Sequence, residues 1–330
     1  MPRGCPSAKH PLRSRGQRGA AILTAMLVVT LVATLAASAL WQQWRSVEVE
    51  AAQRARVQSS WILVGALDWA RLILREDARS GGADHLGEPW AVPLEEARLS
   101  TFFASTTSAT DKAADVQQSF ISGQIIDLQS RLNVLNLVDG AQISPPALRA
   151  FDKLFTLLGL DNAELAVLAE NLRGALDYTS DNAKGKQALL LPQRVGQLAW
   201  LGLSARTLAV LAPYITVLPV RTPVNLNTAP AEVIYACVEA FQIADAHHLV
   251  TARNTTALAS LVDADAVSGN AKARFNPELH SVTSRFFEVR GNLQIEQAIV
   301  QEQSVVRRDG MDVKTLSRKR GVPQNVPVLQ

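Results

Sequence analysis

The chain has few of the residues with which enzymes do chemistry. Its 330 residues include 5 histidines and 2 cysteines, and no GxSxG, HExxH or phosphate-binding P-loop motif occurs. His247 and His248 are adjacent, so they cannot share one helix face as metal ligands spaced four residues apart would. The serines and aspartates are scattered through the sequence. We find no catalytic constellation, and we therefore predict that the protein is not an enzyme.

Cysteine is too rare to indicate a redox compartment. Cys5 lies in the basic N-terminal segment, and Cys237 lies in an apolar helical pattern, where a small core residue is expected. If the N-terminal segment is removed, one cysteine remains, and one cysteine cannot form an internal disulfide. Cysteine usage therefore leaves the question of an oxidising compartment open.

Acidic residues are absent from the first part of the chain. Residues 1–19 hold five basic residues and no Asp or Glu, and the next charged residue is Arg45. An apolar run of about 20 residues can cross the hydrocarbon core of a bilayer, so we predict a single transmembrane helix over residues 20–44. Because positive flanks stay in the cytoplasm, the bulk of the chain is expected on the far side, which in a bacterium is the periplasm.

Helix-breaking residues are also scarce after the apolar run. Residues 45–78 contain no proline and one glycine, which predicts one continuous helix of roughly 85 Å from Ala20 to Ala78. A secretory signal has a shorter apolar core of about 7–15 residues and no use for this continuity. A signal cut near Ala39, or a plain anchor, is the alternative interpretation.

The second half of this helix is apolar on two sides. One face carries Trp61, Gly65 and Trp69, and the other carries Leu63, Leu67, Ala70 and Leu74. Such a helix can pack on its own domain and also on neighbouring subunits. A helix buried entirely within its own domain would show the same pattern, so both interpretations stay open.

The net charge does not indicate a nucleic-acid-binding protein, although the sequence pI is about 9.0. Removing residues 1–19 takes away five of the 33 basic residues and none of the 30 acidic residues, which leaves a net charge of −2. No basic stripe remains in the middle of the chain to follow phosphates. The cluster at 318–320 is assigned to a disordered, solvated tail over residues 309–330.

The remaining sequence alternates between strand and helix patterns. A short helix is expected near 94–103, strands over 118–137, and a helical block over 144–265. Residues 285–306 predict a hairpin with its turn at Gly291-Asn292. These patterns predict an α+β fold in which a long N-terminal helix packs on a small antiparallel sheet and an all-helical domain is inserted between strands.

The N-terminal region resembles a known export signal. A short basic leader, a glycine and an apolar helix that merges into an amphipathic one resemble the class III signal of type IV pilins and pseudopilins. The resemblance implies cleavage by a prepilin peptidase between Gly19 and Ala20. Most members carry Glu as the fifth residue after the cut, whereas this chain has Thr24. The missing Glu is characteristic of the GspK family of minor pseudopilins of type II secretion systems.

This resemblance covers nearly the whole chain and implies an architecture and a set of partners. The pilin-like fold would comprise residues 45–137 and 279–308, interrupted by a helical, SAM-like domain over 138–278. The protein would be a single-pass component of the bacterial inner membrane, placed at the pseudopilus tip to support protein secretion. The implied partners are the minor pseudopilins GspI and GspJ, joined through the first helix, with GspH below.

The stretch Val224–Pro230 is the most distinctive motif after the N-terminus. It matches a segment common in the GspK family and also resembles the start of helix–hairpin–helix DNA-binding modules. Thr228 is expected to cap a helix with Pro230 in its first turn. The following hairpin has no glycine and contains Glu239 and Asp245, which would repel phosphate. A capped helix start tied down by Asn side chains is therefore favoured; the alternative function is a membrane-anchored DNA-uptake protein.

The family binds calcium in Asp-rich loops of its helical domain. The matching loop here offers Asp177, Asp181 and Asn182 as tentative Ca²⁺ ligands, but two lysines follow and further acids of the family are missing. A second stretch, residues 263–270, begins like an EF-hand loop and then departs from that pattern. A polar turn is the expected structure there, and no other cofactor is predicted.

Overall fold

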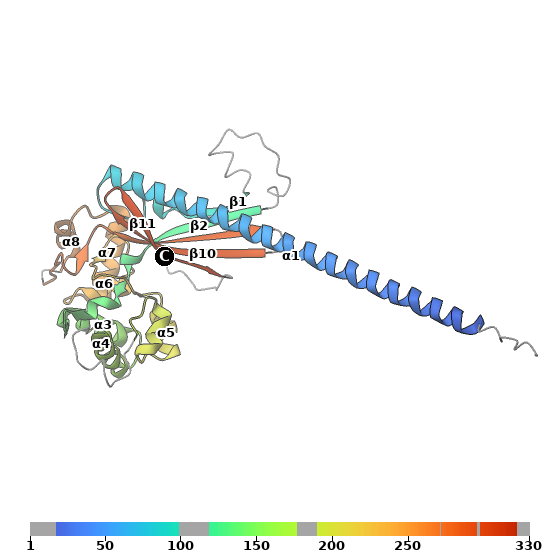
Figure 1. Cartoon of the computed structure of the whole chain (residues 1–330). Coiled ribbons are helices and arrows are strands. Elements are labelled where there is room, and N and C mark those ends of the chain that lie inside the picture. Colours follow the sequence, from blue (N-terminus) through green and yellow to red (C-terminus); the bar gives the residue numbers. More distant parts are fainter. Residues whose placement is uncertain (1–17, 99–118, 177–189, 271, 296–297, 322–330) are drawn as a thin grey trace, which may run out of the picture. The chain divides into compact units, whose positions relative to one another are not determined.

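The computed structural model describes residues 18–98, 119–176, 190–270, 272–295 and 298–321. The chain divides into two compact units, residues 1–60 and residues 61–330. One helix, α1 (Arg18–Ser80), contributes to both units. Figure 1 shows it as a continuous helix coloured blue to cyan. The predicted unbroken N-terminal helix is therefore observed.

In the first unit, α1 is an apolar helix with exposed side chains. Among the described residues it is the one helix long and apolar enough to cross a membrane, with a mean hydropathy of 2.4 in its most apolar window. Its hydroxyl groups donate to carbonyl oxygens three or four residues earlier in the same helix, as at Thr30, Thr34 and Ser38. These internal hydrogen bonds suit an environment without water, where every polar group needs a partner within the protein.

In the second unit, α1 packs on the sheet through one apolar stripe. Leu63, Leu67 and Leu74 on this stripe are at most 6% exposed, and they contact buried residues of the strands. On the other side of the helix, Trp61 is 70% exposed and Trp69 is 43% exposed. The helix therefore packs on its own domain with one face, and its other face carries the two exposed tryptophans.

The sheet has five antiparallel strands in the order β1-β2-β9-β10-β11. Its strands are β1 (Leu94–Arg98), β2 (Ser119–Asp127), β9 (Phe286–Ile295), β10 (Ala298–Asp309) and β11 (Asp312–Gly321). The short helix predicted near 94–103 is wrong for its described part, because Leu94–Arg98 pairs with β2 as an edge strand.

The turn predicted at Gly291-Asn292 is also wrong, because β9 continues through both residues. Gly291 pairs with Gly123 on the neighbouring strand. A Cβ atom on Gly123 would lie 2.8 Å from the Arg290 carbonyl oxygen, and one on Gly291 would lie 3.3 Å from Leu63 of α1. Gly123 therefore allows a close approach of β2 and β9, and Gly291 leaves room for the Leu63 side chain of α1, a second role that glycine has besides turns.

The predicted disordered tail is contradicted over its described part by β11. Arg318 and Arg320 each donate two hydrogen bonds to one oxygen of the buried Glu302 carboxylate on β10. The basic cluster therefore belongs to an edge strand. A register shift in its pairing lies between Val305 and Val306 of β10. Positive charges and an irregular register are common protections of an exposed sheet edge.

Between β2 and β9 the chain forms a helical insert, defined here as the described part of residues 128–283. Its α-helices are α3 (Pro145–Leu157), α4 (Asn162–Leu176), α5 (Ala205–Leu211), α6 (Ala231–Cys237), α7 (Ile243–Thr255) and α8 (Leu261–Ser268). Short 3-10 helices and two-residue strands connect them: η3 (Leu128–Ser130), β3 (Leu132–Asn133), η4 (Val134–Leu137), β4 (Val138–Asp139), β5 (Gln142–Ile143), η6 (Val195–Leu201), β6 (Ile215–Thr216), β7 (Val224–Asn225) and β8 (His280–Ser281). One more 3-10 helix, η1 (Pro89–Ala91), precedes β1.

Local signals explain several of these helices. Pro145 opens α3, and Gly159, with a φ of +65°, follows its end. Asp161 accepts a hydrogen bond from the Ala163 amide at the start of α4. The spacing of Asp161 and Glu164 is that of a capping box, but the Glu164 carboxylate accepts a hydrogen bond from the Ser204 amide at the start of α5. A tertiary contact has replaced the local one.

The insert and the sheet have separate hydrophobic cores. The core of the insert is formed by residues from its own helices and connections, including Phe151, Leu168 and Phe241. The sheet and α1 share another core around Trp90 and Phe287. A small cluster of buried Leu128, Leu218 and Phe286 connects the two parts.

Candidate functional site

The predicted cleavage residues lie at the start of α1. Gly19 and Ala20 are its second and third residues. The Thr24 hydroxyl donates to the carbonyl oxygens of Ala20 and Ala21 at 3.1 and 3.0 Å. At the position where pilins carry a carboxylate, this chain therefore has a neutral group that is hydrogen-bonded within its own helix.

The structure does not test the predicted calcium ligands. Asp177, Asp181 and Asn182 lie outside the described residues, so the calcium site stays a prediction. The second acidic stretch forms α8 instead of a turn. The Ser260 hydroxyl and the Asp263 carboxylate form a capping box at its start. These two side chains are used to begin a helix.

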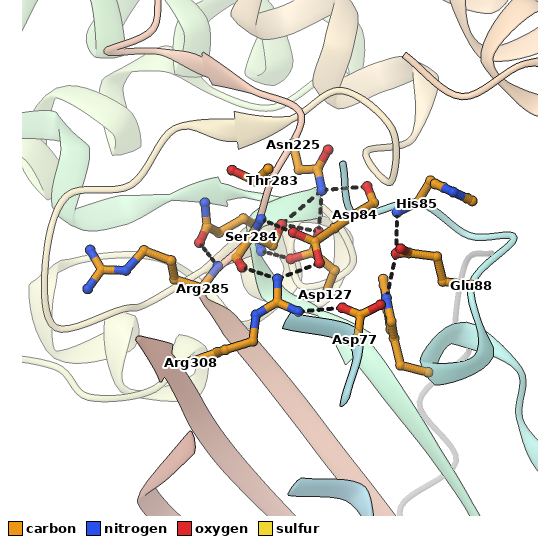
Figure 2. Close-up of polar contacts among 12 residues, drawn as sticks. Asp77, Asp84, His85, Glu88, Asp127, Asn225, Thr283, Ser284, Arg285 and Arg308 are labelled. Carbon is orange, nitrogen blue, oxygen red and sulfur yellow. Dashed lines mark hydrogen bonds and ion pairs between the residues drawn. The ribbon is translucent and has the colours of Figure 1, made fainter. Parts of the chain in front are cut away.

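A buried polar cluster lies where the chain leaves the sheet and where it returns to it. We call it the polar junction and define it by Asp77, Asp84, Asp127, Asn225, Thr228, Ser284 and Arg308; all of these except Thr228 are labelled in Figure 2. These residues come from α1, the loop after it, β2, the insert, the segment before β9, and β10. The cluster thus joins every major part of the second unit.

Asp127 is the acceptor at the centre of the polar junction. It is the last residue of β2 and is 3% exposed. One oxygen accepts the Gln129 amide at 2.7 Å. The other accepts the hydroxyls of Thr228 and Ser284, each at 2.6 Å, and the amide nitrogen of Asn225 at 3.1 Å. Four donors therefore converge on one carboxylate.

Burial changes the protonation behaviour of this carboxylate. Desolvation raises the pKa of Asp127 to about 6, and the hydrogen bonds from Ser284, Thr228 and Gln129 lower the pKa and so oppose that effect. The two influences have opposite signs because donors favour the charged form while burial disfavours it. The balance leaves Asp127 as a titratable group inside the fold.

Arg308 is the donor at the second centre of the polar junction. Its guanidinium donates to Asp77 of α1, to Asp84, and to the Ser284 carbonyl oxygen at 2.9 Å (Figure 2). It also lies over the Phe287 ring, 4.9 Å from the centroid. Burial is the main cause that raises the pKa of both Asp77 and Asp84, and Arg308 opposes the increase. The arginine therefore holds two desolvated carboxylates.

Carboxylate oxygens of Asp77, Asp84 and Glu88 lie within 4.8 Å of one another, a spacing compatible with a metal ion. Arg308 already binds the first two carboxylates. Glu88 accepts the Trp90 indole N–H at 2.7 Å and the His85 amide at 2.9 Å. Because the chain's own donors use these oxygens, we assign no metal to this group.

The distinctive motif Val224–Pro230 supplies part of the junction. The prediction that Thr228 caps a helix is wrong, since its hydroxyl donates to Asp127 and α6 begins after Pro230. The prediction that Asn side chains tie down the segment is confirmed. Asn227 exchanges two hydrogen bonds with the backbone of Leu258, both at 2.9 Å. Asn225 reaches beyond the insert to Asp84 and Asp127.

The hairpin after α6 presents carbonyl oxygens to side chains of the same chain. The Lys153 ammonium donates to the carbonyls of Val238, Glu239 and Phe241 at 2.8, 3.3 and 3.3 Å. The Ala240 carbonyl accepts from Asn270 at 3.1 Å. A phosphate-binding hairpin needs free N–H groups directed at the anion. This hairpin holds a cation instead, which does not favour the DNA-binding alternative.

Sequence reasoning missed the long-range partners of the junction. Asp84, Ser284 and Arg308 stand in segments without a periodic signal, and Arg308 is separated from its two carboxylate partners by 231 and 224 positions. The one available signal was an Asp at the end of a strand, followed much later by an Asn-rich motif. That signal does not identify the partners.

Two family models described as type II secretion system (T2SS), protein K match residues 130–220 and 224–283. A "Type II secretion system protein K" of Pseudomonas aeruginosa is 27% identical over 298 residues, covering 83% of this chain and 84% of that protein. Its namesake from Pectobacterium carotovorum is 25% identical, covering 94% and 98%.

The fold also resembles a solved structure. A chain in "The Crystal Structure of the GspK-GspI-GspJ complex from enterotoxigenic Escherichia coli Type 2 Secretion System" matches with a TM-score of 0.61 and 17% identity, covering 82% of this chain and 99% of that chain. This similarity confirms the predicted α+β fold, with a long N-terminal helix on an antiparallel sheet. Together with the family matches, it shows that the chain is similar to type II secretion system protein K in the sequence of residues 130–220 and 224–283 and in its fold.

Proposed function

We propose that the protein is a minor pseudopilin at the tip of the type II secretion pseudopilus, where it supports protein export across the outer membrane. The observation that carries this proposal is α1, one continuous helix that is mostly apolar and without charge over residues 20–44 and packs on a sheet further along. This arrangement suits a subunit that is first held in a membrane and then packed into a fibre.

Processing and topology form the second part of the proposal. A prepilin peptidase would cut between Gly19 and Ala20, on the cytoplasmic side of a single inner-membrane span, and the bulk of the chain would lie in the periplasm. The five basic residues before the span support this orientation. The neutral Thr24 supports a terminal position, because a buried carboxylate in lipid would need a charged partner from a neighbouring subunit.

The uncovered face of α1 supports assembly through this helix. Trp61, Trp69 and Leu72 are all more than 40% exposed, and exposed apolar side chains grouped on one face mark interaction surfaces. The matching solved chain is part of a complex with GspI and GspJ. We propose these two minor pseudopilins as partners, with GspH below them, and we propose that the helical insert caps the fibre.

Co-purification tests this proposal. The full chain is co-expressed with the type II secretion proteins I and J of the same genome, and a tag on protein J is used for purification. A stable complex of all three proteins is expected. Trp61→Glu combined with Trp69→Glu should lower recovery of the chain at least about tenfold, because buried Trp residues are common interface hot spots.

Trp200→Glu is the matched control, since Trp200 is 51% exposed but lies on η6 of the insert. It should leave recovery unchanged. If the unaltered chain fails to bind proteins I and J, the proposed assembly is wrong. If Trp200→Glu abolishes binding while the α1 variant does not, the interface lies on the insert.

A further inference from the structure

The insert and the sheet are held together by few apolar contacts. Each part has its own hydrophobic core, and the cluster that connects them has three buried residues, Leu128, Leu218 and Phe286. Hydrophobic contact is non-directional. A small apolar cluster can hold two parts near each other, but it does not select one orientation.

Directional contacts between the two parts converge on Asp127. Its donors come from three separate segments: Gln129 directly after β2, Asn225 and Thr228 in the insert, and Ser284 just before β9. Hydrogen bonds weaken steeply when their geometry is lost, and those to a charged acceptor are the stronger kind. One carboxylate therefore connects the end of β2 and the segment before β9 to the Val224–Pro230 motif inside the insert.

The hydrogen bonds around Asp127 and those around Arg308 share residues. Ser284 donates through its hydroxyl to Asp127 and through its amide to Asp84 at 2.6 Å, while its carbonyl accepts from Arg308. Asn225 likewise donates to both Asp127 and the Asp84 carbonyl oxygen. A displacement of the insert at Asp127 would therefore also disturb the hydrogen bonds around Arg308, which binds Asp77 of α1.

We propose that Asp127 is a positioning residue that fixes the helical insert in one orientation on the sheet and on the packed part of α1. The insert then moves as a rigid continuation of the sheet. An Asn side chain at position 127 offers one acceptor oxygen and an NH2 group in place of two carboxylate oxygens, so the four donors no longer all find an acceptor, and buried donors without partners are costly. Rotation of the insert exposes these groups to water while both cores stay intact.

Distance measurements between two spin labels test this proposal on the full chain in detergent micelles. One label is placed at Glu170→Cys on the insert and the other at Lys314→Cys on β11, both exposed positions. Cys5→Ser is included in every variant. Cys237 remains, because burial raises the pKa of its thiol to about 12 and makes it unreactive.

Three variants are compared with the labelled parent. Asp127→Asn keeps the shape of the side chain and removes its charge, and Thr228→Val removes one donor without changing volume. Thr251→Val is the matched control, because its hydroxyl is exposed and donates to the His247 carbonyl within its own helix. We expect the distance distribution to broaden at least about twofold in the first two variants, as for a population of orientations, and to stay narrow in the control.

Circular dichroism is recorded for each variant to show that both parts stay folded. If Asp127→Asn loses helical signal, Thr228→Val alone decides the outcome. A narrow distribution at the parental distance in the folded variants would overturn the proposal, since the apolar cluster would then suffice for orientation.

The consequence for secretion rests on the proposed function. Asp127→Asn should still be processed and should still co-purify with proteins I and J, yet it should lower secretion, because a mobile insert no longer presents a fixed tip. Broadened distances with normal secretion would leave the positioning role intact and refute the need for a rigid tip. Failure to bind proteins I and J in the unaltered chain would refute the proposed function alone.

Discussion

The sheet is joined to the rest of the second unit in two different ways. The packed part of α1 is attached through a stripe of Leu63, Leu67, Ala70 and Leu74. The helical insert is attached mainly through Asn225 and Thr228, which donate hydrogen bonds to Asp127 and Asp84 of the polar junction. The apolar attachment repeats similar contacts along the helix, so it has no strict geometry. The polar attachment depends on hydrogen bonds between single atoms. This difference predicts where substitutions change stability and where they change orientation.

The largest effect is expected from Arg308→Met, which lies in the polar junction and joins β10 to α1 and to the loop after it. The side chains of Arg308, Asp77 and Asp84 are all at most 12% exposed, so the variant leaves two buried carboxylates without a counterion. We expect a loss of about 3–5 kcal/mol in the free energy of unfolding, measured by urea unfolding of the full chain in micelles. Arg79→Met removes an exposed pair with Glu76 and should cost at most about 1 kcal/mol. Equal losses would contradict the importance of the junction.

The apolar attachment should respond to cavity formation. Leu74 is fully buried against the sheet, whereas Leu72 on the same helix is 48% exposed. Leu74→Ala should cost about 2–5 kcal/mol in the free energy of unfolding, and Leu72→Ala less than about 0.5 kcal/mol. The same urea titration measures both. A cost for Leu72→Ala as large as that for Leu74→Ala would mean that the exposed face is covered within the chain.

Stability should depend on pH through the polar attachment, which contains Asp127, and not through the apolar stripe of α1. The pKa of Asp127 is raised to about 6 in the folded protein, above the usual value of about 3.9. A raised pKa means that its contribution to stability is fully present below about pH 4 and is lost as the pH rises through about 6, up to about 3 kcal/mol in total. The difference in unfolding free energy between the parent and Asp127→Asn should follow this curve.

Asp265→Asn provides the control for this titration, because Asp265 is exposed on α8. The pH dependence of Asp127→Asn is compared with that of this variant. A difference from the parent that stays flat for Asp127→Asn would show that the hydrogen bonds at Asp127 fully compensate its burial.

A smaller effect is expected for a polar contact that lies inside the insert. Lys153→Met removes the ammonium that binds three carbonyls after α6, and the loss of these bonds should cost about 1–2 kcal/mol. It should leave the spin-label distance between insert and sheet unchanged. Lys272→Met, at an exposed position, should change neither quantity. A broadened distance in Lys153→Met would show that the junction is sensitive to the interior of the insert.

Much of the fold could be predicted because local patterns determine it. The apolar run without charge, the absence of proline from residue 20 to residue 88 and the spacing of Leu63, Leu67 and Leu74 are local patterns that match helix geometry. Residues such as Pro145 and Gly159 marked helix ends for the same reason. Local patterns therefore predicted the long helix, its two apolar faces and the helical character of the insert.

The polar junction could not be predicted, because its partners are far apart in the sequence. Thr228 has the local features of a helix cap, yet its hydroxyl lies 2.6 Å from Asp127, 101 positions away. Gly291 looked like a turn residue, and the close approach of Leu63 explains it instead. In each case the local sequence suggested one role for the residue, and a neighbour far away in the sequence gave it another.

The most direct test of the proposed function is the mass and N-terminal sequence of the membrane-bound protein, produced with and without a prepilin peptidase. We predict a chain that begins at Ala20, methylated on its amine, only when the peptidase is present. An intact Met1 under both conditions, or a cut near Ala39, would contradict the pseudopilin account and would indicate a plain anchor or a secretory signal.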